Sequence, residues 1–229
     1  MHLLSVIIPT LNEAEGIGKT IHAIPITQLK ELGFETEIIV IDGDSTDGTI
    51  KLARDADAKV IVEKRRGYGR AYKTGFENAN GEVIVTLDAD GTYPAEDIPY
   101  LLKEMKEKNH DFITTNRFAK METDAMSSRN KFGNQVLSFT TKTLYGVSFQ
   151  DSQSGMWVFR KSVWNAIKEK VKSDGMAFSQ EIKIEAYAHK FKCCEIGITY
   201  RKREGEVKLN AYRDGIGNLT HLFRKKVCG

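Results

Sequence analysis

The segment VIVTLDAD, residues 83–90, decides the fold that this sequence predicts. Its first five residues form a nearly unbroken apolar run, which is typical of a strand buried on both faces of a parallel sheet. The last three, Asp88-Ala89-Asp90, follow directly and place two carboxylates beyond the end of that strand. In open α/β sheets ligands bind outside the carboxyl ends of the strands, so the segment predicts a binding site as well as a strand.

Short apolar runs alternate with amphipathic stretches throughout the first half of the chain. Four further runs predict strands at residues 4–8, 37–41, 59–63 and 112–115. Between the runs, helical spacing predicts helices near residues 14–30, 48–57, 69–79 and 96–108. This alternation predicts an α/β domain with a mostly parallel sheet flanked by helices.

The second half of the chain is less regular. Its patterns predict helices near residues 127–144, 161–170, 179–189 and 213–227, and strands at 155–159 and 194–200. The last helix has apolar residues at helical spacing, flanked by basic residues: Ile216, Leu219, Leu222, Phe223 and Val227, with His221, Arg224, Lys225 and Lys226. A basic amphipathic helix suits an anionic membrane surface. Packing of its apolar face on the rest of the domain is the alternative.

Composition excludes several classes of protein. A net charge of +3 over 229 residues does not predict a nucleic-acid partner. The three cysteines lack C-x-x-C spacing, which disfavours a disulfide framework or a zinc site. No apolar run approaches the ~18 residues that span a bilayer, and the N-terminus lacks the layout of a signal peptide. We therefore expect a cytoplasmic protein, at most peripheral at the cytoplasmic face of a membrane.

The two carboxylates of Asp88 and Asp90 are a candidate metal site. Alternation along an extended segment places both on the same side. Two hard oxygen ligands at an open edge suit Mg²⁺ or Mn²⁺, with substrate phosphates as further ligands. The alternative is a solvated loop in which one Asp caps a helix.

Three more polar loops follow predicted strands, so they should share an edge with Asp88 and Asp90. They are PTLNE at 9–13, VIDGDSTDGT at 40–49 and GYGRA at 67–71. Asp42 is placed to accept a hydrogen bond from a base, Gly67 and Gly69 permit close backbone approach, and Arg70 could face phosphate. Turn formation and helix capping explain each loop alone. Their coincidence on one edge favours a nucleotide site.

Together, these loops and LDADGTYPAED at 87–97 resemble family 2 glycosyltransferases of the GT-A fold. The resemblance implies an inverting transfer from a nucleoside-diphosphate sugar with a divalent metal, Mg²⁺ or Mn²⁺. It assigns the surroundings of the base and ribose to Pro9, Leu11, Glu13, Val40 and Asp42. It assigns nucleotide and metal contacts to Asp88, Ala89 and Asp90.

Later segments resemble polyprenyl-phosphate sugar synthases. These are TNRF at 115–118, DSQSGM at 151–156, FSQE at 178–181 and REGEVK at 203–208, together with Arg129 and Asn134. The picture is that of a dolichyl-phosphate mannose, glucose or N-acetylglucosamine synthase. It implies an acceptor-phosphate site at Arg117, Arg129 and Asn134, and donor contacts from Arg203 and Lys208. A lipid phosphate needs cations to orient it, and arginine suits bidentate phosphate contact. For each arginine alone, a structural ion pair is the alternative.

These features predict a GT-A catalytic domain at residues 1–210 with a C-terminal amphipathic helix at 211–229. The nucleotide-sugar half is expected at 1–118 and the acceptor half at 119–210. The expected catalytic residues are Asp90, Arg117, Arg129 and Arg203. The expected reaction moves a sugar from a GDP- or UDP-sugar to a polyprenyl (dolichyl) phosphate at a membrane surface, for glycan precursor synthesis.

Three other functions stay open on the sequence. The nearest is the same fold acting on a saccharide or protein acceptor, which needs a carboxylate base such as Glu181 or Asp151. The others are a nucleotidyltransferase, which would release pyrophosphate, and a non-catalytic nucleotide-sugar-binding module.

Overall fold

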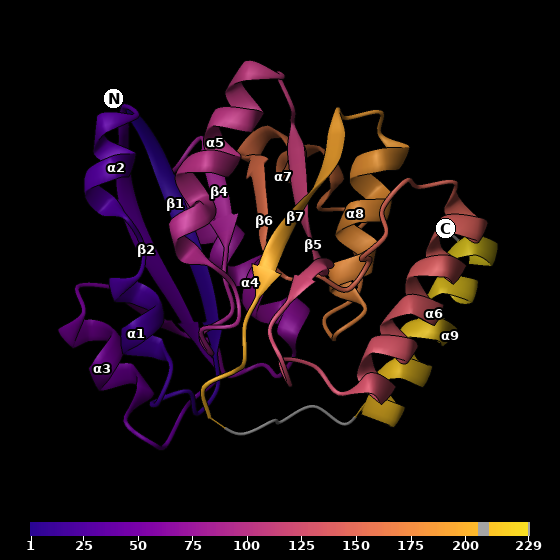
Figure 1. The fold of residues 1–229 in the computed structure, drawn as a ribbon, viewed down its shortest axis with the longest axis horizontal. Helices are drawn as coiled ribbons and strands as arrows, with labels where there is room; N and C mark the ends of the chain where they lie inside the picture. Colours follow the sequence, from indigo (N-terminus) through magenta and orange to yellow (C-terminus); the bar gives the residue numbers. More distant parts are fainter. Residues whose placement is uncertain (206–210, 229) are drawn as a thin grey trace.

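The computed structural model describes residues 1–205 and 211–228 as one seven-stranded sheet with helices on both faces (Figure 1). The strands are β1 (His2–Thr10), β2 (Phe34–Asp42), β3 (Lys59–Val62), β4 (Val83–Thr86), β5 (Phe112–Met121), β6 (Trp157–Arg160) and β7 (Cys193–Tyr200). The helices are α1 (Ile17–His22), α2 (Ile26–Glu31), α3 (Thr49–Asp55), α4 (Tyr68–Asn78), the 3₁₀ turn η1 (Ala95–Asp97), α5 (Ile98–Glu107), α6 (Ser128–Tyr145), α7 (Lys161–Ile167), α8 (Phe178–Ala188) and α9 (Ala211–Cys228). Every strand expected from the sequence is present.

The sheet is mixed but mostly parallel, as expected. Its strand order is β3-β2-β1-β4-β6-β5-β7. The β1–β2, β1–β4, β2–β3 and β5–β7 pairs are parallel, whereas β6 runs antiparallel to both of its neighbours. The carboxyl ends of β1, β2, β3 and β4 therefore open on one edge, where the predicted loops lie.

Apolar side chains on both faces of the sheet explain the unbroken apolar runs. One face packs against α1, α2 and α5, and the other against α4, α7 and α8. Neighbouring residues such as Val6 and Ile7 belong to opposite layers, and both are fully buried. An aromatic group of Tyr72, Trp157 and Phe178 fills the second layer.

The single helix expected near residues 14–30 is wrong, because the chain forms two short helices there. α1 ends at His22 and α2 begins at Ile26, with Pro25 between them at the N-cap. Proline has no backbone N–H to donate and disfavours helical geometry in the residue before it. The chain therefore breaks at Pro25.

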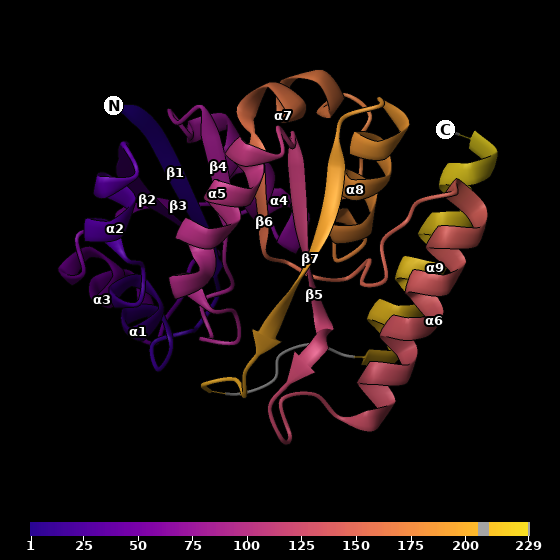
Figure 2. The same ribbon diagram turned by 45° about the horizontal axis from the view of Figure 1, so that its top comes forward.

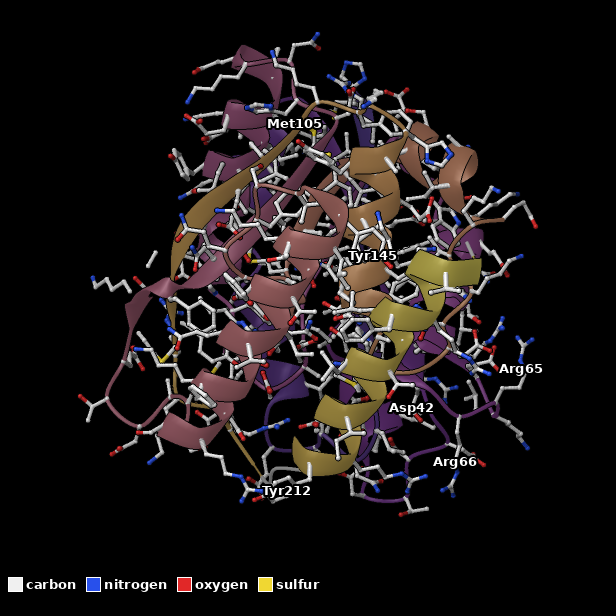
Figure 3. All side chains as sticks on the ribbon, turned by 90° about the vertical axis from the view of Figure 1, so that its right-hand side faces the viewer. Asp42, Arg65, Arg66, Met105, Tyr145 and Tyr212 are labelled. Atoms are coloured by element: carbon white, nitrogen blue, oxygen red, sulfur yellow. The ribbon has the colours of Figure 1, made fainter. Side chains whose placement is uncertain are left out.

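The helices α6 and α9 form a parallel pair at the end of the sheet that carries β7 (Figure 2). Near one end the Arg129 guanidinium lies 3.6 Å from the ring centre of Tyr212. Near the other the Tyr145 hydroxyl donates to the Leu222 carbonyl at 2.6 Å. Figure 3 shows Tyr145 and Tyr212 toward opposite ends of this pair. Across the described ranges, none of the helices is long and apolar enough to cross a membrane.

The face that α9 turns inward differs from the one its sequence suggested. Leu222 is fully buried against α6 and α8, and Lys225 and His221 also face the domain. Ile216 and Phe223 point outward and are 66% and 52% exposed. The apolar stripe is thus split between an inner contact and an outer surface.

Candidate active site

Asp42 closes the end of β2 and organises the loop that follows. Its fully buried carboxylate accepts hydrogen bonds from Thr10 Oγ1 at 2.8 Å, Ser45 N at 2.7 Å and Ser45 Oγ at 2.7 Å. A carboxylate offers about four acceptor positions, so about one remains after these three bonds. A contact from a nucleotide base to Asp42 stays a prediction that this geometry can accommodate.

The loop after β1 is hydrogen-bonded to the loop after β2. Asn12 N donates to Ser45 Oγ at 2.7 Å, and Glu13 N donates to Thr49 Oγ1 at 2.8 Å. Leu11 is 48% exposed on this edge, a position suited to an apolar contact with a ligand. The other residues predicted to surround the base and ribose differ in burial. Pro9 is half-buried, and Val40 is fully buried in the core beneath the loop.

Asp88 and Asp90 follow β4 as expected, but their surroundings differ. Asp88 is half-buried, and its Oδ1 accepts from the hydroxyls of Tyr68 at 3.3 Å and Tyr72 at 3.4 Å. Asp90 is 6% exposed, and its Oδ1 accepts from Thr92 N at 3.1 Å and Thr92 Oγ1 at 2.7 Å. The buried Ala89 between them accepts through its carbonyl from Thr20 Oγ1.

The two tyrosines are site residues that sequence reasoning missed. Tyr68 lies inside the G-Y-G segment, and Tyr72 follows one helical turn later on α4. Spacing of i and i+4 places both on one helix face. That spacing was the available signal for their shared contact with Asp88.

The electrostatics of this pair fit a divalent cation. Burial raises the pKa of Asp88 to about 7, with repulsion from Asp90 adding to the effect and the charges of Arg117 and Arg203 opposing it. A cation beside Asp88 and Asp90 would stabilise the ionised form of Asp88. Among residues 1–205 and 211–228, no cluster of three or more His, Cys, Asp or Glu side chains could hold a metal alone. Substrate phosphates and water would have to supply the other ligands, as Mg²⁺ sites often require.

Arg203 joins the loop after β1 to the loop after β4, which carries Asp88 and Asp90. Its Nη2 lies 3.0 Å from Asp90 Oδ2 and 3.2 Å from Glu13 Oε1. Its buried Nε has no hydrogen-bond partner within the described part of the chain. A guanidinium with a buried, unused donor suits an anionic ligand such as a phosphate. Lys208, the other predicted cation of this segment, lies outside the described residues.

Arg117 is held in a buried, bidentate ion pair with Asp151. Nε and Nη2 of Arg117 donate to the two carboxylate oxygens at 2.7 and 2.8 Å, and the Arg117 main-chain N–H donates to the same group at 3.1 Å. Arg117 is 7% exposed and Asp151 is fully buried. Burial alone would raise the pKa of Asp151, but the charge of Arg117 and its hydrogen bonds hold that pKa below the ordinary value.

The glycine loop before α4 lies against another part of the chain. Gly67 has φ +138°, and a Cβ there would come within 2.1 Å of the Asp174 carbonyl oxygen. Arg70 donates through Nη2 to both carboxylate oxygens of Asp174 at 2.8 Å. The close approach that glycine permits is therefore to the 172–174 segment, and the donor contacts of Gly67 and Arg70 stay predictions.

Arg129 and Asn134 lie on α6, where they engage other partners. The exposed Arg129 stacks on Tyr212, and Asn134 Nδ2 donates to Met126 Sδ at 3.5 Å. In residues 1–205 and 211–228, no hydrogen bond or ion pair links either one to Arg117. The structure thus gathers Arg117 and Arg203 around the Asp88 loop and leaves Arg129 on the helix pair.

Glu181, considered as a possible base, joins α8 to α9. It is 1% exposed and lies 2.9 Å from Lys225 Nζ and 3.4 Å from His221 Nε2. Burial would raise the pKa of Glu181, but the nearby His221 and hydrogen bonds from Ser173 N and Lys225 lower it to about 2. A carboxylate with so low a pKa is a weak proton acceptor at neutral pH.

Comparison with known proteins identifies the family of this chain. The family model described as glycosyl transferase family 2 matches residues 5–167. The chain is 35% identical over 222 residues to the low-salt glycan biosynthesis hexosyltransferase Agl6 of Haloferax volcanii, covering 96% of this chain and 53% of that protein. It is 30% identical over 213 residues to a dolichyl-phosphate hexose transferase of the same organism, covering 93% of this chain and 89% of that protein. The chain thus spans about half the length of the first relative.

The fold is similar to that of glucosyl-3-phosphoglycerate synthase from Mycobacterium tuberculosis, crystallised with Mn²⁺, UDP-glucose and phosphoglyceric acid. The TM-score is 0.78 at 16% identity, covering 100% of this chain and 81% of that chain. This likeness confirms the expected GT-A architecture. Because the family model covers well over half of the chain, this protein belongs to the family 2 glycosyltransferases.

Proposed function

We propose that this protein moves a sugar from a GDP- or UDP-sugar to a polyprenyl phosphate such as dolichyl phosphate, with inversion at the anomeric carbon. The product would serve glycan precursor synthesis. The dolichyl-phosphate hexose transferase that this chain resembles along most of its length supports the acceptor class.

One observation carries the choice of a phosphate acceptor: the carboxylates considered as bases are both held by cations. Asp151 is bound by Arg117, and Glu181 by Lys225. A hydroxyl acceptor needs a base to remove its proton, whereas a phosphate monoester is already ionised near neutral pH. A phosphate needs cations to orient it, and Arg117, whose charge lowers the pKa of Asp88, is the candidate for that role.

Asp88 and Asp90 would hold Mg²⁺ or Mn²⁺ together with the donor diphosphate, and the bound ion would neutralise the charge on the leaving group. Arg203, which contacts Asp90, is the candidate cation for the diphosphate. Arg117 would orient the acceptor phosphate, with Arg129 and Asn134 as further acceptor contacts and Lys208 as a further donor contact.

The reaction needs one displacement and no proton transfer from the protein. An oxygen of the acceptor phosphate forms a bond to the anomeric carbon while the bond from that carbon to the diphosphate oxygen breaks. The electron pair leaves with the nucleoside diphosphate. Attack from the face opposite the leaving group inverts the configuration. The site residues hold the two anions, which repel each other, in line for this step.

Labelled GDP- and UDP-sugars offered with Mn²⁺ to dolichyl phosphate, free dolichol or free sugars test this proposal. We expect labelled lipid phosphate and released nucleoside diphosphate with dolichyl phosphate alone, because dolichol lacks the ionised nucleophile. Transfer to free sugars but not to dolichyl phosphate would favour the saccharide acceptor instead. Release of pyrophosphate when a nucleoside triphosphate and a sugar phosphate are offered instead would indicate a nucleotidyltransferase. Binding of the nucleotide sugar without turnover would indicate a non-catalytic module.

The outer face of the α6–α9 pair supports the membrane part of the proposal. Large apolar side chains on it are at least 40% exposed: Phe132, Val136, Phe139, Tyr212, Ile216, Phe223 and Val227. Single exposed apolar residues are ordinary, but a row on two adjacent helices marks an interaction surface. Exposed cations accompany the row: Lys131, Lys142, Arg224 and Lys226. This charge favours an anionic lipid surface over a neutral one.

A Phe139→Ser/Phe223→Ser variant should bind anionic vesicles at least about tenfold more weakly, because each buried Phe contributes about 1.5–3 kcal/mol. Sedimentation with phosphatidylcholine vesicles, with and without phosphatidylglycerol, measures this. Tyr100→Ser is the matched control, because Tyr100 is 52% exposed on α5. Binding of the double variant as tight as that of the wild type would contradict the assignment. Wild-type binding that does not increase with phosphatidylglycerol would also contradict it.

A further inference from the structure

Lys183 of α8 is a buried cation whose N–H donors all bind one loop, the segment 151–154 that leads into Gly155. It is 1% exposed, and its Nζ donates to the carbonyls of Asp151 at 3.0 Å, Ser152 at 3.0 Å and Ser154 at 2.9 Å. An ammonium group has three N–H donors, so these bonds use all of them. Burial lowers the pKa of Lys183 to about 7, against the opposing charge of Asp151. A lysine is rarely this deep unless its charge is compensated, so the contact with the loop is specific.

The two ends of this loop are supported differently. The Gly155 end is fixed without Lys183, because Gly155 N donates to Tyr93 Oη at 2.6 Å and Thr86 Oγ1 donates to the Gly155 carbonyl at 2.7 Å. At the other end, Asp151 N donates to Glu195 Oε1 and Ser152 N donates to Ser138 Oγ. The carbonyls of these two residues receive no side-chain donor other than Lys183 from residues 1–205 and 211–228. Loss of Lys183 should therefore loosen the Asp151 end more than the Gly155 end.

The Asp151 end is the one that holds Arg117. Both oxygens of the Asp151 carboxylate bind the Arg117 guanidinium, and the Arg117 main-chain N–H bonds to the same group. Asp151 N in turn donates to Glu195 Oε1 at 2.8 Å. The guanidinium position thus follows from where the Asp151 backbone lies, and Lys183 fixes that backbone through two carbonyls.

We propose that Lys183 is a positioning residue for the acceptor half of the site: it sets the 151–154 loop and, through Asp151, aims Arg117. This inference rests on the proposed role of Arg117 at the acceptor phosphate. Lys183 contacts neither Asp90 nor Arg203 in the described part of the chain. Its removal should therefore affect the use of the acceptor and leave donor binding largely unchanged.

Lys183→Met keeps the length of the side chain and removes all three donors. We expect kcat/KM for polyprenyl phosphate to fall by about a hundredfold, the cost typical of a small misplacement of a reacting group. The dissociation constants of GDP and UDP with Mn²⁺ should change by less than about threefold, because a change of that size is within ordinary context effects. Lys183→Arg, which retains charge and donors, should recover activity to within about tenfold of the wild type.

Lys161→Met is the matched control. Lys161 Nζ also donates to a main-chain carbonyl, that of Ala79, but at the opposite edge of the sheet. It should show wild-type kinetics with both substrates. Amide hydrogen exchange in the same variants measures the loop without any acceptor: exchange over residues 150–155 should quicken in Lys183→Met and not in Lys161→Met.

Wild-type acceptor kinetics in folded Lys183→Met, or unchanged exchange over residues 150–155, would overturn the inference. If Lys183→Met fails to fold, Lys183→Leu, which also lacks donors, replaces it under the same two criteria. Failure of the wild type to glycosylate polyprenyl phosphate would refute the proposed function instead. Exchange would then still decide whether Lys183 sets the loop.

Discussion

Replacing Asp90 by Asn is expected to lower turnover by about a thousandfold or more and to leave the fold intact. Asparagine keeps an oxygen that can accept from Thr92 N and Thr92 Oγ1, the two bonds that shape the loop. It removes the negative charge that a divalent cation needs. Metal stabilisation of a leaving group is worth several kcal/mol, and about 1.4 kcal/mol corresponds to tenfold in rate.

The Asp90→Asn effect should appear in transfer assays titrated with Mn²⁺, while the thermal unfolding midpoint stays close to that of the wild type. Asp55→Asn is the control, because Asp55 is exposed on α3 and pairs only with a surface lysine in the described part of the chain, Lys51. It should be indistinguishable from the wild type. Normal metal-dependent transfer by Asp90→Asn would refute the assignment of Asp88 and Asp90 as the metal site.

Asp151→Leu should have the largest effect on stability. It removes the carboxylate that compensates Arg117 and leaves a buried guanidinium without its charge partner. Breaking a buried ion pair on one side typically costs about 3–5 kcal/mol. The free energy of unfolding measured with urea should therefore fall by that amount, and the midpoint concentration of urea should fall with it.

The double variant Arg117→Met/Asp151→Leu separates folding from catalysis. Replacing a buried pair by apolar residues of similar volume is often neutral for stability, so much of the lost stability should return. The double variant should nevertheless fail to transfer sugar to polyprenyl phosphate, because no guanidinium remains to orient the acceptor. Recovery of activity together with stability would mean that Arg117 serves the fold alone. Asp55→Asn again serves as the control and should leave the unfolding midpoint unchanged.

The helix pair shows where sequence patterns stop being sufficient. Leu222 and Phe223 belong to one apolar stripe in the sequence, yet Leu222 is fully buried and Phe223 is 52% exposed. Adjacent residues on a helix point about 100° apart, so a wide stripe can serve two surfaces at once. Which part turns inward was decided by Glu181 and Glu185, whose carboxylates bind Lys225 at 2.9 and 2.5 Å.

The sequence by itself determined the seven strands, the helices between them except for the break at Pro25, and the edge on which Asp42, Asp88 and Asp90 gather. It could do so because strand burial follows from local apolar runs, and parallel strands bring their carboxyl ends to one edge. Only the tertiary structure decided which cations reach that edge. Arg117 does so through Asp151, 34 residues away, and Arg203 through Asp90, whereas Arg129 stacks on Tyr212 instead. Lys183 carried no motif at all. Such pairings depend on packing between distant segments, and neither periodicity nor spacing along the chain encodes them.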